Sequence, residues 1–445
     1  MQYKWLNSRV IKISDEYTSI TFNDNFNEKI EPNTLPDHLT TIEFGFRFNQ
    51  GINVNTLPVN LTTLIFGYKF NQKIEPNTLP DNLSYLTFQG NFNQKIEPNI
   101  LPDNLISLIF GYDFNQEIDP NMLPKKLTTL IFGYNFNQKI ELNTLPKNLT
   151  TLIFGDKFNQ EIEANILPEK LSYLTFGYFF NQKIELNTLR DNLSYLTFGN
   201  KFNQKIEPNI LSKNLTNLTF RLNFNQKIEP NTLPENLTNL TFGRDFNQKI
   251  EPNTLPKNLT TLIFGRNFNQ KIEPNTLPEN LINLIFGHWF NQKIEPNILP
   301  DNLKKLVFGY CFNKIIEANT LPDNLKKLVF GKYFNQIIEP AVLPNDSIII
   351  FNWIIDSRII INKTHINMVN NIPNYYSVKI FLNYHHSYID ELKWPIHIIK
   401  FNGHMWPLKI YHIVKTYNHT HYGDTTILIN KNTYEPYSSA KSTLK

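Results

Sequence analysis

Histidine is the residue type in this sequence that most suggests chemistry, and it is unevenly distributed. The chain has 445 residues and 10 His, of which 8 lie after residue 346. Imidazole nitrogens bind zinc, but a zinc site needs three or four ligands at compatible spacing. The segment has no Cys and few acidic residues, so we predict no metal site and keep a metal-binding tail as an alternative. The eight are His365, His385, His386, His397, His404, His412, His419 and His421.

Catalytic motifs are the second kind of chemistry to consider. The sequence contains no G-x-S-x-G, G-x-G-x-x-G or Walker-type loop. Its single Cys, Cys311, has no evident base paired with it and is interpreted as an incidental thiol. One Cys also excludes a disulfide scaffold. We therefore predict that the protein is not an enzyme, has no catalytic residues and binds no cofactor.

The residues that remain are arranged by an internal repeat. The pair Phe-Asn recurs at a constant interval, from Phe26 through Phe48 and Phe70 to Phe334, in 15 copies without an insertion. The unit reads F-N-Q-K-I-E-P-N-T-L-P-x-N-L-T-x-L-x-F-G-x-x, and its positions are numbered 1 to 22 from the Phe. A period of this length without insertions is typical of a solenoid, in which each copy is one coil and stacked coils share a core.

The columns of the repeat predict the structure of each coil. The segment L-x-x-L-x-F at positions 14 to 19 alternates apolar and polar residues and predicts a strand. Gly at position 20 would let the chain turn sharply, and Pro at positions 7 and 11 excludes a regular helix on the far side. The expected fold is mainly β: about 15 coils of 22 residues, one parallel sheet, turns or 3₁₀ pieces on the convex side, and few α-helices.

Two Asn columns are expected to support the coils. Asn occupies position 2 in all 15 copies and position 8 in 14. A side chain with one donor group and one acceptor group can hydrogen-bond the backbone of neighbouring coils, so both columns are interpreted as structural ladders. Lys at position 4 and Glu at position 6 are interpreted as a solvated ladder of weak ion pairs.

The period ends near residue 345. We predict an N-terminal cap over residues 1–25, the repeat solenoid over 26–345 and a β-rich C-terminal cap region over 346–445, because an open solenoid end exposes an unpaired strand. The tail has 10 basic and 6 acidic residues, so it carries the whole net charge of +4. Further strands are predicted over residues 10–13, 17–22, 348–351, 378–382, 396–401, 408–414 and 425–429.

The variable surface lies on the predicted strand face. Position 16 holds small polar residues, Tyr or Lys, and position 21 beside it is often aromatic. Exposed aromatic residues on a rigid face are typical of protein-binding surfaces, and the alternative is that the columns only stabilise the sheet. Lys304, Lys305, Lys326 and Lys327 form a basic patch. The candidate partner-binding residues are Tyr68, Tyr85, Tyr112, Tyr134, Tyr173, Tyr178, Tyr195, Tyr310, Lys305 and Lys327.

The string F-N-x-x-I-x-P-x-x-L-P-x-x-L-x-x-L-x-F-G resembles the FNIP repeat, which is similar to leucine-rich repeats. The resemblance implies a binding scaffold of the kind found in social amoebae and in giant viruses of amoebae. Some relatives carry an N-terminal F-box, which implies substrate recognition in a ubiquitin-ligase system. Only the segment 1–25 precedes the first Phe-Asn, so that role would need a separate adaptor and is kept as an alternative.

The expected function is therefore a non-enzymatic repeat scaffold that binds another protein through the exposed sheet face. The weakly basic net charge gives no sign of a nucleic-acid partner, and no segment has the length and apolar character of a membrane span. The N-terminus does not read as a signal peptide. We expect a monomer that works inside the cell, in the cytoplasm, or in the host cytoplasm if the protein is viral.

Overall fold

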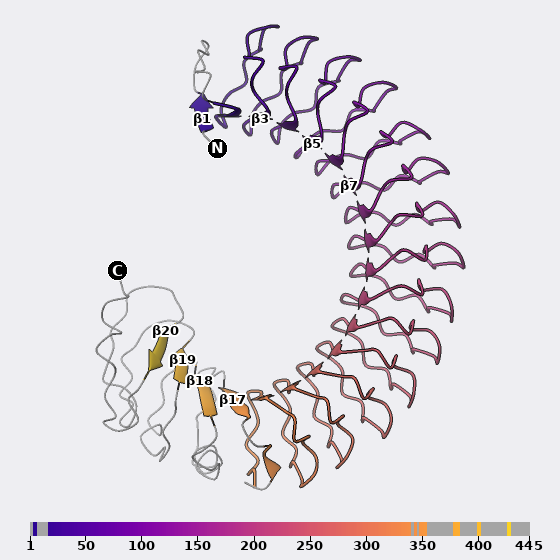
Figure 1. Cartoon of the computed structure of the whole chain (residues 1–445), viewed down its shortest axis with the longest axis vertical. Helices are drawn as coiled ribbons and strands as arrows, with labels where there is room; N and C mark the ends of the chain where they lie inside the picture. The colour runs from indigo at the N-terminus through magenta and orange to yellow at the C-terminus, as the bar shows by residue number, and fades with distance from the viewer. Residues whose placement is uncertain are drawn as a thin grey trace. The chain divides into compact units, whose positions relative to one another are not determined.

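The computed structural model describes residues 3–6, 17–339, 342–344, 347–353, 377–382, 398–401 and 425–428. The chain forms two compact units, Met1–Gln226 and Lys227–Lys445. Within each unit, short strands lie along one side of the stacked coils, and turns and loops lie along the other (Figure 1). The described elements are all strands, so the prediction of a mainly β solenoid with 22-residue coils is confirmed.

The first unit contains eleven described strands in a parallel sheet. Each strand pairs with the next in chain order, and the partners of the repeat strands are equivalent positions of consecutive coils, as in Thr41↔Thr63. The strands are β1 (Tyr3–Leu6), β2 (Ser19–Phe22), β3 (Thr41–Glu43), β4 (Thr63–Ile65), β5 (Tyr85–Thr87), β6 (Ser107–Ile109), β7 (Thr129–Ile131), β8 (Thr151–Ile153), β9 (Tyr173–Thr175), β10 (Tyr195–Thr197) and β11 (Asn217–Thr219).

The second unit contains nine described strands. From β12 to β19 the pairing is parallel, and β19 pairs with β20 in antiparallel fashion. The strands are β12 (Asn239–Thr241), β13 (Thr261–Ile263), β14 (Asn283–Ile285), β15 (Lys305–Val307), β16 (Lys327–Phe330), β17 (Ile348–Trp353), β18 (Ser377–Leu382), β19 (Ile398–Phe401) and β20 (Thr425–Leu428).

The strands at the two ends of the chain test the predictions made outside the regular repeat. Strands over 17–22, 348–351, 378–382, 396–401 and 425–429 are confirmed within a few residues. β1 was not predicted, and the segments 10–13 and 408–414 lie outside the described residues. That these strands act as caps stays a prediction, as do the three domain boundaries.

The core consists of columns that repeat once per coil. Positions 1, 5, 10, 14, 17 and 19 are buried, as Phe114, Ile118, Leu123, Leu127 and Leu130 show in one coil. The Phe ring of position 19 stacks on the Phe ring of position 1 in the following copy at centroid distances near 3.8 Å, as in Phe132–Phe136. The same columns stack again from coil to coil, so burial and stacking are continuous along each unit.

The repeat strands are shorter than predicted. From β3 to β15 each covers positions 16 to 18 rather than 14 to 19, with a buried centre and more exposed flanks, and β16 extends to position 19. The backbone at position 14 closes a tight turn instead, as when the Leu83 N–H donates to the Pro80 carbonyl at 3.0 Å. Position 19 still bonds the next coil, since the Phe88 N–H donates to the Ile109 carbonyl at 2.8 Å.

The predicted turn does begin at the position-20 glycines, since the Phe136 N–H donates to the Gly133 carbonyl at 3.2 Å, but glycine is required there for another reason. A β-carbon on Gly133 would overlap the backbone of Gly111 in the preceding coil, and the same holds for Gly155 against Gly133. None of the position-20 glycines that the structure describes has a φ in the left-handed region. Glycine is therefore required because successive backbones approach closely here.

The position-2 Asn ladder is confirmed. The backbone N–H of each Asn donates to the side-chain Oδ1 of the preceding one, as from Asn115 to Asn93 at 2.9 Å and from Asn137 to Asn115 at 2.8 Å. The following Gln adds a bond, since Gln138 Nε2 donates to Asn115 Oδ1 at 3.1 Å. These side chains join consecutive coils outside the sheet.

The position-8 Asn column is not a side-chain ladder, and this prediction is corrected. All 14 of these residues have φ between 60° and 67°. Asn tolerates this left-handed conformation far better than most residues with a side chain. A third Asn column, at position 13, was missed: Asn104 Nδ2 donates to the Asp81 carbonyl at 2.8 Å, and several other coils repeat that bond.

The predicted Lys–Glu ladder is present and lies at the surface. Lys183 and Glu185 are 2.8 Å apart, and equivalent pairs recur in many described coils. Some Lys side chains also reach the next coil, as Lys139 reaches Glu163 at 3.0 Å. Exposed pairs of this kind contribute little each, about 0–1 kcal/mol.

Candidate functional site

The strand-face column is formed by the position-16 side chains, which point to the side of the sheet opposite the core. Tyr85, Tyr173 and Tyr195 are 50%, 38% and 46% exposed, whereas the next residue on each strand is buried. The alternation of a strand places them there. The exposure predicted for these three tyrosines is therefore observed.

Two of these tyrosines meet. Tyr173 on β9 and Tyr195 on β10 are register partners, and their ring centroids are 5.8 Å apart with planes inclined at 30°. Tyr85 instead has Thr63 and Ser107 as its register neighbours. The strand face of the first unit thus carries one tyrosine pair and one tyrosine among small polar residues.

The strand-end column is formed by position 21, directly after the glycine. Phe46 and Tyr68 stack at 5.1 Å, and Lys69 Nζ lies 5.7 Å from the Phe46 ring and 5.6 Å from the Tyr68 ring. The Tyr68 ring occupies the space that a side chain on Gly90 would need. In this coil the glycine is Gly90 at position 21 instead of position 20, and it makes room for the Tyr68 ring.

A second stack lies further along this column. Tyr112 and Tyr134 are parallel within 3° at 4.6 Å, and Lys157 Nζ lies 5.7 Å from the Tyr134 ring. The pKa of Tyr112 is raised, first by lost hydration and then by the negative charges that Tyr134, Tyr68 and Asp113 would place near its phenolate. Tyr112 is therefore a neutral hydrogen-bonding phenol at physiological pH.

Tyr178 packs against Phe179, a residue that was not among the predicted binding residues. Its ring meets Phe179 edge to face at 4.8 Å, and Lys201 Nζ lies 5.8 Å from it. Phe179 is 41% exposed. It belongs to position 22, whose high variability from coil to coil was the signal available in the sequence.

Tyr310 is the candidate aromatic residue of the second unit. It stacks on His288 at 4.5 Å, and His288 also contacts the exposed Trp289. The pKa of His288 is lowered by desolvation and by the positive charges of Arg266 and Lys332. The imidazole is therefore neutral at physiological pH and adds an aromatic surface without charge.

The predicted basic patch lies on β15 and β16. Lys305 and Lys327 are direct register partners, and Lys304 and Lys326 precede them with exposed side chains. Within the described residues, none of the four forms an ion pair, whereas many position-4 lysines do. Like charges placed opposite each other destabilise a sheet, so this arrangement has an electrostatic cost.

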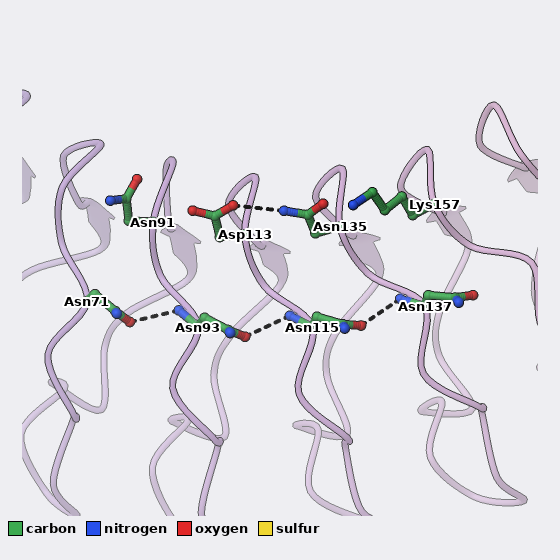
Figure 2. A pocket seen from close by; sticks show the side chains of 8 residues that line it. All are labelled: Asn71, Asn91, Asn93, Asp113, Asn115, Asn135, Asn137 and Lys157. Carbon is green, nitrogen blue, oxygen red and sulfur yellow. Dashed lines mark hydrogen bonds between the residues drawn. The ribbon is translucent and has the colours of Figure 1, made fainter.

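The first unit also carries an open polar groove with a volume of about 550 Å³. Figure 2 shows its two rows of side chains, one from position 2 and one from position 22. We name it the amide groove. Its lining is Asn71, Asn93, Asn115 and Asn137 in the first row and Asn91, Asp113, Asn135 and Lys157 in the second.

Comparison with known proteins then places the chain in a family. The model of the FNIP Repeat matches residues 12–47, 48–91, 92–135, 136–179, 180–223, 224–267, 268–311 and 312–351. The chain belongs to the FNIP repeat family. The matched segments cover most of the sequence, and most of them span two FNIP coils.

A solved structure extends the comparison of the FNIP coils. CroV588 of a giant virus, described as a circular LRR protein, is 46% identical in sequence and has a TM-score of 0.78. The match covers 85% of this chain and 56% of that one, so the FNIP chain spans little more than half of CroV588. A search of curated proteins found no match.

Two further structures are similar at low identity. An internalin of Listeria monocytogenes is 15% identical, with a TM-score of 0.29 and coverage of 80% of this chain and 78% of that one. A mouse RP105/MD-1 complex is 13% identical, with a TM-score of 0.32 and coverage of 83% of this chain and 88% of that one.

The FNIP coils show no metal or thiolate chemistry in the part that the structure describes. No group of three His, Cys, Asp or Glu side chains could hold a metal ion among these residues. Burial raises the pKa of the Cys311 thiol, which opposes a nucleophilic role. The eight tail histidines lie outside the described residues. Among the described residues there is also no helix long and apolar enough to cross a membrane.

Proposed function

We propose that this FNIP repeat protein is a non-enzymatic scaffold that binds a protein partner through its strand face. The observation that supports this most directly is the exposed pair Tyr173–Tyr195, held in register on β9 and β10. Tyrosine provides a large contact area at a low cost in conformational entropy and is enriched at binding hot spots. FNIP and leucine-rich-repeat solenoids are typically scaffolds of this kind.

The second unit presents a surface of different chemistry. The four lysines of β15 and β16 favour an acidic region of a partner, because an opposite charge would relieve their mutual repulsion. The protein's own tail has a net charge of +4, which makes it a poor match. The stacked pair His288–Tyr310 adds a neutral aromatic contact in the same unit.

A chain with a single Cys cannot form a disulfide within itself, as is usual for proteins of a reducing compartment. We therefore place the proposed role in the cytoplasm and expect the scaffold to be a monomer. No observation in the described residues favours a ubiquitin-ligase role or a metal-binding tail over this scaffold.

The test is quantitative affinity capture with the double variant Tyr173→Thr/Tyr195→Thr. Thr occupies the same column at Thr151, so the variant should fold and lose only the aromatic surface. We expect at least a roughly tenfold loss of the principal partner, as for a hot-spot pair. The control is Thr151→Ser, which should retain that partner. Equal recovery with the double variant and the wild-type protein would refute the strand face as the binding surface.

A further inference from the structure

The amide groove has unused hydrogen-bonding capacity on its first row. Asn71, Asn93 and Asn115 each accept the backbone N–H of the next coil through Oδ1. Because a backbone N–H can only donate, these bonds fix which side-chain atom is oxygen. The Nδ2 groups are therefore donors, and they have no acceptor in the part of the chain that the structure describes. The first row thus presents a line of N–H donors.

The second row presents acceptors as well as donors. Asn135 Nδ2 donates to one carboxylate oxygen of Asp113 at 2.8 Å (Figure 2). The other carboxylate oxygen and Asn135 Oδ1 have no hydrogen-bond donor among the described residues. Asn91 offers a further amide, and Lys157 places an ammonium group at one end. The groove therefore has donors along one wall, and the acceptors of Asp113 and Asn135 lie along the other between Asn91 and Lys157.

The groove results from small side chains at position 22. The same column holds Lys69 before Asn91 and Phe179 after Lys157, and neither residue lines the groove. Between these larger residues, the amides and the carboxylate leave the space between the two rows open. The groove thus depends on one variable column as well as on the invariant Asn ladder.

We propose that the amide groove is a binding site for a neutral oligosaccharide. A hydroxyl group both accepts and donates, so one hydroxyl can accept from an Asn Nδ2 on the first row and donate to an oxygen on the second. The rows repeat once per coil, and successive rings of the adjoining position-1 column, Phe114 and Phe136, are 6.1 Å apart, which suits a chain that offers hydroxyls at every sugar.

An extended peptide fits this groove less well. Peptide grooves gain specificity from side-chain pockets, and every side chain that lines this groove is polar. The presence of donors and acceptors side by side instead matches a ligand whose polar groups act in both senses.

The experiment is calorimetric titration of the full chain with cellohexaose, chitohexaose and maltohexaose. We expect saturable binding of at least one of them. Asn135→Phe should abolish it by filling the groove, and the column already carries Phe179. Asp113→Ala should weaken it about tenfold through the loss of a charged acceptor. The control is Asp191→Ala, which removes a carboxylate of the first unit that lies outside the groove and pairs with Lys213 at 2.6 Å.

Three results would overturn the proposal. One is that none of the three saccharides binds at millimolar concentration. Another is that binding survives in an Asn135→Phe protein with an unchanged melting temperature. The third is that a neutral Gly–Ser peptide binds at the groove and the saccharides do not. The site is independent of the proposed protein-binding face, so Tyr173→Thr/Tyr195→Thr should leave saccharide binding unchanged, and the two proposals can fail separately.

Discussion

The backbone of Gly111 occupies the space where a β-carbon on Gly133 would have to lie. We therefore expect Gly133→Ala to force two coils apart and to lower the free energy of unfolding by about 3 kcal/mol. Denaturant unfolding measures this loss. The control is Gly51→Ala, since a β-carbon there meets open space and should cost almost nothing. Similar stabilities for the two variants would contradict the close-approach explanation.

Asn143 tests the second conformational requirement. Its φ is 65°, so Asn143→Ala should cost about 1–2 kcal/mol. Asn143→Gly should have little effect because glycine adopts this conformation without strain. Both are measured as shifts in the denaturation midpoint. If the glycine variant were as unstable as the alanine variant, the side chain rather than the backbone conformation would be the cause.

Substitution of Thr78 should stabilise the protein. Its buried hydroxyl has no hydrogen-bond partner in the described part of the chain, and the same column accepts Ile100 and Val342. Thr78→Val should raise the free energy of unfolding by about 1 kcal/mol, since it removes an unsatisfied polar group. Thr144→Val is the matched control, because the Thr144 hydroxyl donates to the Ile118 carbonyl at 3.3 Å. That variant should gain less or lose stability.

Lys305 tests the cost of the basic patch. Lys305→Glu would replace a repulsive register pair with Lys327 by an attractive one, and should add up to about 1 kcal/mol of stability at low salt. The gain should shrink as added salt screens the charges. Thr261→Glu is the control, since its register partners Asn239 and Asn283 carry no charge. A gain that is insensitive to salt would exclude an electrostatic origin.

His288 should give the protein a measurable acid sensitivity. Its pKa is lowered from 6.5 in the folded state, so the unfolded chain binds a proton first as the pH falls. Stability contributed by the neutral imidazole is therefore present above pH 6.5 and is lost as the pH falls through the folded-state pKa. Comparing His288→Tyr with the wild-type protein between about pH 8 and about pH 5 should show a smaller loss in the variant. Equal losses of stability in the two proteins would mean that other titratable groups dominate the pH dependence.

Much of the fold could be predicted because the repeat exposes each structural requirement as a column. The apolar columns identified the core, the strand and the solenoid, and their burial in Phe114, Leu127 and Leu130 is as expected. The physical cause of an invariant residue was harder to predict. Gly133 and Asn143 are constrained by a neighbouring backbone and by a left-handed φ respectively. Neither constraint is visible in residue type alone.

The candidate site was predictable only in part. Exposure of Tyr85, Tyr173 and Tyr195 follows from strand alternation, and the Tyr173–Tyr195 pair follows from a register that joins equivalent positions of consecutive coils. The amide groove does not follow in the same way. It joins positions 22 and 2 across several coils, and the distance between two such rows depends on the path of the loop between them.

The position-2 Asn ladder also has a direction. In each described link the side-chain oxygen belongs to the earlier coil and the backbone N–H to the later one, as from Asn27 to Asn49 and from Asn159 to Asn181. A completed coil therefore presents a free acceptor to the segment that the ribosome delivers next. During synthesis from the N-terminus, each new coil would therefore find a side-chain oxygen already in place for its own backbone N–H.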